Sequence, residues 1–232
     1  MGASYNRGLR RFVALCPITA AIILASLLLH AAVLVYELRG ETEVYRRLGA
    51  VETLTLFQVG EKDGPLVPVP QMSGPFELWD GQWWRILVSA FHHGGMLHVA
   101  MNGIGIAALG WLLEPRLGSA RYLLFFLAGT MISMLPEFLL EHQAVGLSGG
   151  VYALFGMLLP LRRRDPDVES ILTPQFVRFG LAWLIGCVLF TQIGIVHIAN
   201  AAHFTGFIYG WIAGQVCFGA FRSSTLIRWS FV

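Results

Sequence analysis

The amino-acid sequence predicts an all-α membrane protein that crosses the bilayer several times. Of its 232 residues, 56% are hydrophobic and only 13% are charged, whereas an ordinary soluble domain carries about 25% charged residues. The mean hydropathy is +0.64, and the apolar residues gather in long runs. Lipid is therefore expected to surround most of the chain, and apolar runs of this length form helices there.

Six apolar runs are interpreted as membrane-spanning helices that form one bundle. They are Val13–Val35, His93–Leu113, Tyr122–Leu140, Leu147–Leu161, Phe176–Ile193 and Asn200–Phe221. One domain is expected over residues 1–232, with the first helix at 12–36, a first loop at 37–89 and five further helices within 90–221. The first loop is too polar to span the bilayer and too long for a turn, so it is expected to associate with the membrane surface.

The distribution of positive charge predicts the orientation of the bundle. Eleven of the Lys and Arg residues precede the first span, follow the last one, or lie in loops on that same side, and five lie on the other side. Because cytoplasmic loops carry the excess of Lys and Arg, both termini are expected to be cytoplasmic. The net charge of +2 reflects this asymmetry and does not indicate a nucleic-acid partner.

Polar side chains inside the expected spans are candidates for function, because they are costly in lipid. They are His98 and Asn102 in the second span, Ser148 and Tyr152 in the fourth, and Asn200 and His203 in the sixth. Each has a plainer interpretation, since a serine among glycines often serves helix packing and an i, i+4 polar pair can bond a neighbouring helix. The combination favours chemistry, because a nucleophile, a base and a pair of hydrogen-bonding groups occur on three helices.

Helix geometry predicts how deep Ser148 lies. Fourteen residues separate it from Arg162, which corresponds to about 21 Å of helix. The hydrocarbon core is about 30 Å thick, so Ser148 should lie roughly 9 Å below its outer boundary. Irregular backbone is tolerated at that depth only where protein covers it or water lines it. Ser148 is therefore expected at the floor of a wet cavity that opens to the outside.

Small residues recur along the fourth and sixth spans. They are Gly149, Ala153 and Gly156 in the fourth, and Ala202, Gly206, Gly210 and Gly214 in the sixth. Such seams of small residues let two helices approach closely in a membrane. Ser148 and His203 each lie one residue from a seam, so contact between the seams would bring the histidine within hydrogen-bond reach of the serine.

Five motifs between Gly81 and Gly214 resemble the rhomboid intramembrane serine proteases. They are GQWWR at 81–85, HHGGMLHVAMN at 92–102, EPRLGS at 114–119, GLSGGVYALFG at 146–156 and ANAAHFTGFIYG at 199–210. G-x-S-G alone is a weak signal, but the five motifs in this order are a strong one. Gln82 and Ala201 depart from the family's common Glu and Gly, away from the reacting groups. The resemblance implies the minimal six-helix form of the family.

The resemblance also implies a catalytic Ser-His dyad. The implied catalytic residues are Ser148 and His203, and the implied supporting residues are His98, Asn102, Gly146 and Tyr152. Ser148 would be the nucleophile, and His203 the general base that takes its proton. His98, Asn102 and the Ser148 backbone N–H would stabilise the oxyanion, while Tyr152 would stack on the imidazole. The spans that carry these groups hold no Asp or Glu, so a dyad is expected rather than a triad.

The sequence therefore favours a serine-type endopeptidase, a hydrolase that cuts membrane proteins in or near their transmembrane segments. The alternative is a catalytically silent rhomboid-like protein that binds client transmembrane helices. Such proteins typically lack the serine or the histidine, and both are present here. A transporter is less favoured, because no inverted repeat and no carboxylate for ion coupling is apparent in the spans.

No cofactor is expected. No metal is expected either, because the spans hold no set of His, Cys and carboxylate residues at ligand spacing, and the three cysteines have no paired spacing. The expected partners are transmembrane protein substrates and the lipid bilayer, and the expected location is a bacterial-type inner (plasma) membrane. The sequence does not indicate an oligomeric state.

Overall fold

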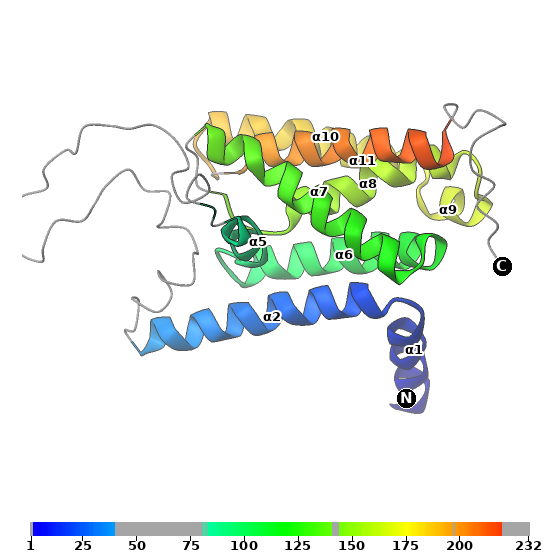
Figure 1. Cartoon of the computed structure of the whole chain (residues 1–232), viewed down its shortest axis with the longest axis horizontal. Helices are drawn as coiled ribbons and strands as arrows, with labels where there is room; N and C mark the ends of the chain where they lie inside the picture. The colour runs from blue at the N-terminus through cyan, green and yellow to red at the C-terminus, as the bar shows by residue number, and fades with distance from the viewer. Residues whose placement is uncertain (1, 40–80, 82, 141–143, 197, 220–232) are drawn as a thin grey trace, which may run out of the picture.

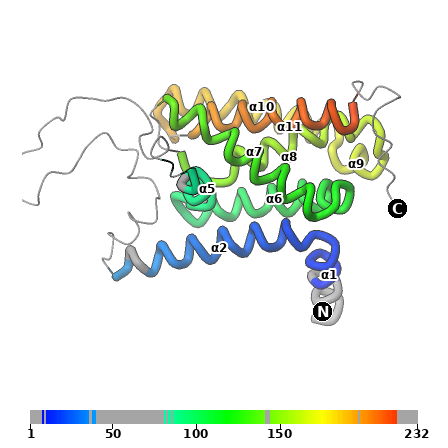
Figure 2. Tube along the Cα trace, in the orientation of Figure 1, coloured from blue at the N-terminus to red at the C-terminus, as the bar shows by residue number. Residues whose placement is uncertain are grey.

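The structure is a computed structural model of the chain, and it describes residues 2–39, 81, 83–140, 144–196 and 198–219. Every regular element among these residues is a helix (Figures 1 and 2), which confirms the predicted all-α class. Most of the expected first loop, namely 40–80 and 82, lies outside the described residues. Its association with the membrane surface therefore stays a prediction.

The first long apolar helix begins later than the sequence suggested. Helix α1 (Gly2–Leu15) ends before Cys16, and α2 (Pro17–Leu38) follows it, with α1 turned sharply away from the axis of α2 (Figure 1). The predicted helix at 12–36 and its span from Val13 therefore start too early, because Val13 still belongs to α1. Proline has no N–H to continue a helix but suits the first position of one, so Pro17 marks the start of the long apolar helix.

A further helix occupies the end of the expected first loop. Helix α5 (Trp84–Phe91) buries Ile86, Ser89 and Ala90, so the boundary predicted at residue 89 is wrong. Eight residues are too few to show a clear helical period. The next helix, α6 (Met96–Leu117), starts three residues after the predicted His93, since the two glycines before Met96 disfavour helix.

The remaining long helices follow the predicted spans to within three residues at each end. They are α7 (Ser119–Leu139), α8 (Ser148–Arg162), α10 (Pro174–Gln192) and α11 (Asn200–Phe218). A short helix that the sequence analysis missed, α9 (Pro166–Ile171), lies between α8 and α10. Asp165 caps it by accepting the backbone N–H groups of Asp167 and Val168 at 3.0 and 3.2 Å, as Asp commonly does at a helix start.

Helix α8 lies at the centre of the bundle (Figure 1) and packs against α11, α7 and α6. Eleven of its 15 residues are buried, so protein rather than lipid surrounds it. Helices α2, α6, α7 and α10 are long and apolar enough to cross a membrane, by length and composition. These four helices make the chain an integral membrane protein. The count of six spans, which needs α8 and α11 as well, stays a prediction.

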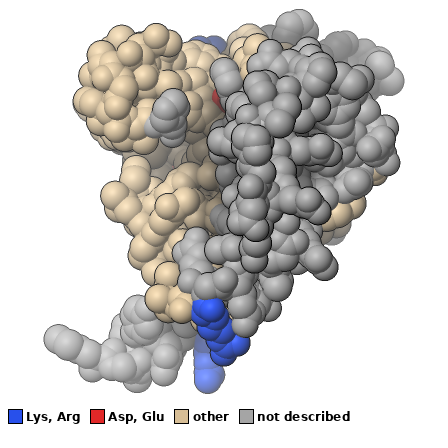
Figure 3. Space-filling model, turned by 90° about the vertical axis from the view of Figure 1, so that its left-hand side faces the viewer, with Lys and Arg blue, Asp and Glu red and all other residues tan. Residues whose placement is uncertain are grey.

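Arginines tie together the helix ends at one end of the bundle, near α9. The interactions are Arg116 with Asp165, Arg162 with Glu169 at 3.3 Å, and Arg164 Nη2 with the Gly219 carbonyl at 3.1 Å. The hydrogen bond from Arg116 holds the pKa of the Asp165 carboxyl below its usual value. Uncharged residues predominate on the described surface at the opposite end (Figure 3). The ends of α6 and α8, which carry part of the predicted arginine excess, thus lie close to α9. Arg222 and Arg228 lie outside the described residues, and the cytoplasmic location of this end stays a prediction.

A buried carboxylate explains the EPRLGS motif physically. Glu114 is fully buried, and its Oε1 accepts the N–H of Ile18 at 2.9 Å and the hydroxyl of Ser119 at 2.7 Å. Its Oε2 accepts the N–H of Thr19 at 2.8 Å and the Thr19 hydroxyl at 2.7 Å. The first N–H groups of a helix have no acceptor within that helix. Glu114 therefore caps α2 from α6 and also binds the start of α7.

The small-residue seams of α8 and α11 are in contact, as the sequence predicted. A Cβ added to Gly206 would lie 2.1 Å from the Gly149 carbonyl oxygen, and one added to Gly210 would lie 1.9 Å from the Ala153 carbonyl oxygen. No real Cβ fits at such distances, so the two backbones themselves touch. This contact fixes the first turn of α11 beside the first turn of α8.

Gly210→Ala is expected to destabilise the protein by about 1–3 kcal/mol or more, because the added methyl group would force α11 away from α8. The loss should appear as a lower apparent melting temperature in detergent. Gly186→Ala is the matched control, since a Cβ there would meet only Phe190, at 3.9 Å. An unchanged melting temperature in Gly210→Ala would mean that the helices do not need this close approach.

Candidate active site

Ser148 and His203 form a hydrogen bond across the contact between α8 and α11. Ser148 is the first residue of α8, and His203 lies in the first turn of α11. The distance from Ser148 Oγ to His203 Nε2 is 2.7 Å. When the imidazole carries its proton on Nδ1, the serine hydroxyl donates to Nε2. Nδ1 has no hydrogen-bond partner among the described residues, so no carboxylate there orients the ring.

Tyr152 contacts the imidazole from one turn further along α8. The ring centroids of Tyr152 and His203 are 4.7 Å apart, and the ring planes make an angle of 39°. The sequence analysis predicted this neighbour, although the rings are tilted rather than parallel. Tyr152 and His203 are both buried, at 9% and 6% exposure, so the tyrosine ring restricts the rotation of the imidazole.

His98 and Asn102 lie against the backbone that leads into Ser148. A Cβ on Gly146 would lie 2.6 Å from His98 Nε2 and 3.2 Å from Asn102 Nδ2, and Gly146 has a φ of +98°. Glycine is therefore required there both by its left-handed backbone and by the two side chains. Asn102 is buried, and its Nδ2 has no hydrogen-bond partner among the described residues. This amide is thus a free donor, among the described residues, beside Gly146, which precedes Ser148 by two residues.

The start of α8 adds backbone donors at the same place. The N–H groups of the first turn of a helix have no acceptor within the helix, and they carry the positive end of the helix dipole. Ser148 is the first residue of that turn, and Leu147 before it contributes no side-chain cap. The candidate site residues from the sequence analysis therefore lie together in the structure. They are Ser148, His203, His98, Asn102, Gly146 and Tyr152.

The sequence analysis missed a carboxylate within the spans. Glu137 lies inside α7 and is 2% exposed, so the expectation that the spans hold no carboxylate is wrong. Its Oε1 accepts the N–H of Ala202, the residue before His203, at 3.1 Å. Thr130 and Ser133 are also fully buried on α7. These three polar positions recur at i, i+3 and i+7 in the mostly apolar α7. This spacing, which puts them on one face of the helix, was the signal in the sequence for a buried polar group.

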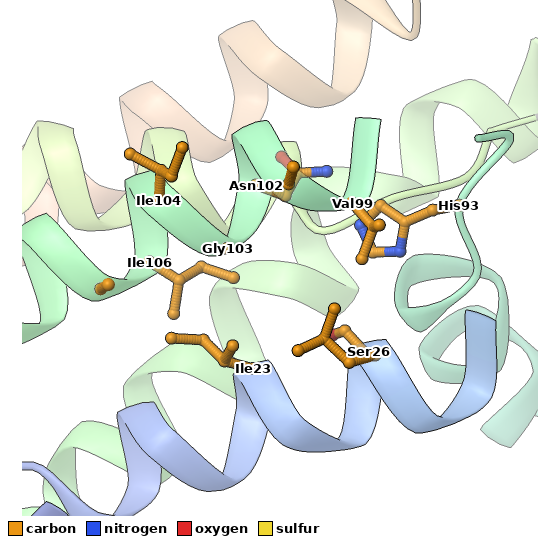
Figure 4. A pocket seen from close by; sticks show the side chains of 11 residues that line it. Ile23, Ser26, His93, Val99, Asn102, Gly103, Ile104 and Ile106 are labelled. Atoms are coloured by element: carbon orange, nitrogen blue, oxygen red, sulfur yellow. The ribbon is translucent and has the colours of Figure 1, made fainter. Parts of the chain in front are cut away.

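A cavity of about 320 Å³ lies between α2 and α6 (Figure 4). Its lining is mostly apolar, with Ser26, His93 and Asn102 among its members. Asn102 therefore lies between this cavity and the backbone at Gly146. Ser148 does not line this cavity, so it is not the wet cavity expected above Ser148. The segments just before α8 and α11, at 141–143 and 197, lie outside the described residues, so that cavity stays a prediction.

Metal ligands do not come together in the part of the chain that the structure describes. No group of three or more His, Cys, Asp or Glu residues there could hold a metal ion. The arrangement around Ser148 instead offers a nucleophile, a base and several hydrogen-bond donors.

A model of the rhomboid domain family matches residues 80–220, which is more than half of the chain. The chain belongs to the rhomboid family. The matched residues run from the start of α5 past the end of α11, and they include every residue of the site described above. The rhomboid resemblance seen in the sequence motifs is therefore confirmed at the level of the family.

Curated relatives support the same assignment. RHOMBOID-like protein 5 of Arabidopsis thaliana is 30% identical over 162 residues, covering 66% of this chain and 51% of that protein. Rhomboid protease GlpG of Klebsiella pneumoniae is 35% identical over 132 residues, covering 55% of this chain and 46% of that protein. Rhomboid protease GluP of Bacillus subtilis is 28% identical over 168 residues, covering 71% and 30%. The rhomboid chain thus spans about half the length of these relatives or less.

Proposed function

We propose that this rhomboid chain is an intramembrane serine endopeptidase, which hydrolyses peptide bonds in or near the transmembrane segments of membrane proteins. Ser148 is the nucleophile, and His203 is the general base. The observation that carries the proposal is the 2.7 Å separation of Ser148 Oγ and His203 Nε2, because a hydroxyl becomes an effective nucleophile when a base within hydrogen-bond reach takes its proton.

The reaction begins when Ser148 Oγ attacks the carbonyl carbon of the substrate peptide bond and its proton moves to His203 Nε2. The carbonyl π bond breaks, and its electron pair stays on the oxygen as an oxyanion. The carbon–nitrogen bond then breaks, and the proton on Nε2 passes to the leaving amine. Water, deprotonated by the same nitrogen, attacks the acyl carbon. The bond from that carbon to Ser148 Oγ then breaks, and the proton on Nε2 returns to Oγ. His203 thus acts alternately as base and acid.

Three donors are proposed to meet the oxyanion: the Asn102 amide, the His98 ring and the Ser148 backbone N–H. Asn102 Nδ2, which has no hydrogen-bond partner in the described part of the chain, and the approach of both side chains to Gly146 support this role. Donors that are fixed before the reaction stabilise developing charge without reorganising. The dipole of α8 acts in the same direction.

The substrate is proposed to be a transmembrane span that is cut near its outer end. A helix in lipid hides its carbonyl groups in its own hydrogen bonds, which are costly to break there. Ser148 lies at the opposite end of α8 from Arg162, so the site would meet the end of a substrate helix rather than its middle. This orientation assumes the predicted cytoplasmic termini in a bacterial-type inner membrane. Segments with weak helix propensity should be cut most readily.

A silent rhomboid-like protein that binds client helices is the second candidate. The observation that favours it is that the Arabidopsis relative is named a RHOMBOID-like protein, without the word protease, while the two bacterial relatives are named proteases. Reactivity of the serine separates the candidates, because a client-binding protein needs no activated nucleophile.

Labelling with a fluorophosphonate tests the proposal. The wild-type protein in detergent or lipid should be labelled on the peptide that contains Ser148, whereas folded Ser148→Ala should not. Ser133→Ala is the matched control, because Ser133 is a buried serine next to Gly149 whose hydroxyl donates to the Thr130 carbonyl at 2.8 Å. It should label like the wild type. Folded wild-type protein that neither labels nor cleaves would support the silent alternative.

A further inference from the structure

Glu137 is a buried carboxylate that contacts the residue before His203, and the proposed reaction does not use it. It lies in α7, where a carboxyl group in apolar surroundings is costly unless it is well hydrogen-bonded. Its Oε1 accepts the backbone N–H of Ala202 at 3.1 Å, and both residues are buried. The group therefore binds the backbone directly next to His203.

The N–H of Ala202 belongs to a helix end that needs an acceptor. Ala202 is the third residue of α11, and Ala199 before the helix contributes no side-chain cap. The N–H groups of the first turn of a helix find no acceptor in the helix itself. Glu137 thus caps α11 from a neighbouring helix, in the turn that carries His203.

The same turn is held on its other side by α8. A Cβ on Gly149 would lie 3.4 Å from the Ala202 carbonyl oxygen, and one on Gly206 would lie 2.1 Å from the Gly149 carbonyl oxygen. The backbone before His203 therefore sits between the Glu137 carboxylate and the residue after Ser148. A shift of this turn would change the distance between Oγ and Nε2 directly.

We propose that Glu137 is a positioning residue, whose carboxyl oxygen fixes the first turn of α11 and so holds the His203 imidazole in line with Ser148. The inference rests on the proposed function, and it assigns Glu137 no contact with substrate. The required element is an acceptor at the right distance from the Ala202 N–H, not the negative charge. A misplacement of about 1 Å in an active site can cost about 100-fold in rate.

Two substitutions separate these requirements. Glu137→Gln keeps the length of the side chain and an acceptor oxygen but removes the charge. Glu137→Asp keeps the charge but shortens the side chain by one methylene. With a model transmembrane substrate, Glu137→Gln should keep kcat within about 3-fold of wild type, and Glu137→Asp should lower kcat by about 10–100-fold, with KM nearly unchanged in both.

Glu114 provides the matched control. Like Glu137, it is buried and caps a neighbouring helix, but its carboxylate oxygens accept the N–H groups of Ile18 and Thr19 in α2. Glu114→Asp should lower the melting temperature while the folded fraction keeps wild-type kcat. If Glu137 had a purely structural role, Glu137→Asp would also lower the melting temperature while the folded fraction kept wild-type kcat. That result would overturn the proposal. So would a Glu137→Gln variant that does not fold or is slower than Glu137→Asp.

Hydrogen exchange tests the contact without catalysis. In a Ser148→Ala background, Glu137→Asp should speed the exchange of amides 200–203, and Glu137→Gln should leave it near the level of the unmodified background. Unchanged exchange in Glu137→Asp would overturn the proposal whether or not the protein cleaves. The exchange could change as expected while the protein that keeps Ser148 neither labels nor cleaves. That result would support the helix cap by Glu137 and contradict the proposed function instead.

Discussion

Ser148→Ala and His203→Ala are each expected to lower cleavage of a model transmembrane substrate by at least about 10⁴-fold, because the nucleophile and its base act as a unit. The double variant should be no slower than either single variant, since removing one member already disables the other. Initial rates of cleavage in liposomes, normalised to folded protein, provide the measurement. The two side chains meet at 2.7 Å, so removing either one leaves the other without its partner in the proposed dyad.

The control for this pair is Ser133→Ala, which removes a buried hydroxyl beside the same helix and should change the rate by less than a few-fold. Both catalytic variants should also keep the wild-type melting temperature within a few degrees, because neither side chain is part of the seams. Cleavage at the wild-type rate by folded Ser148→Ala would assign the nucleophile to another residue.

The sequence was sufficient to predict the pairing of Ser148 with His203, since the reasons for it are periodic. Small residues at every third or fourth position define which faces of α8 and α11 can touch, and the two reactive side chains adjoin those faces. The apolar runs likewise predicted the long helices to within a few residues. These features depend on spacing along one helix, which a sequence displays directly.

Single contacts between helices that follow no periodic pattern were not predicted. Glu137 lies in α7, but its partner is the N–H of Ala202, which is 65 positions away. The break between α1 and α2 was also missed, because Pro17 stands inside one continuous apolar run and its effect on direction depends on how α1 packs. Helices α5 and α9 are too short to show the helical periodicity of apolar residues. For α9, the remaining local signal was Asp165, which caps its start.

The placement of His98 and Asn102 could be predicted only as a shared helix face. Their i, i+4 spacing puts them on one side of α6, but the spacing does not show what they face. The backbone at Gly146 supplies that information, because its φ of +98° turns the chain toward both side chains. A left-handed glycine is not visible as such in a sequence, so its meaning emerged from the structure.

Asn102→Ala and His98→Ala are each expected to lower kcat by about 10²–10³-fold, the usual cost of removing one oxyanion donor. KM should change little, because the oxyanion exists in the transition state and not in the bound substrate. Asn102→Asp should be at least as slow as Asn102→Ala, since it replaces the amide donor with a negative charge beside the developing oxyanion. The fluorophosphonate should still label Ser148 in all three variants, although more slowly, because Ser148 and His203 remain paired.

Asn200→Ala is the control, because the Asn200 side chain donates to Thr191 Oγ1 at 2.8 Å. It should cleave at the wild-type rate. If His98→Ala and Asn102→Ala also kept wild-type kcat, the two groups would serve only to pack α6 against the backbone at Gly146. The backbone N–H groups at the start of α8 would then have to hold the oxyanion by themselves.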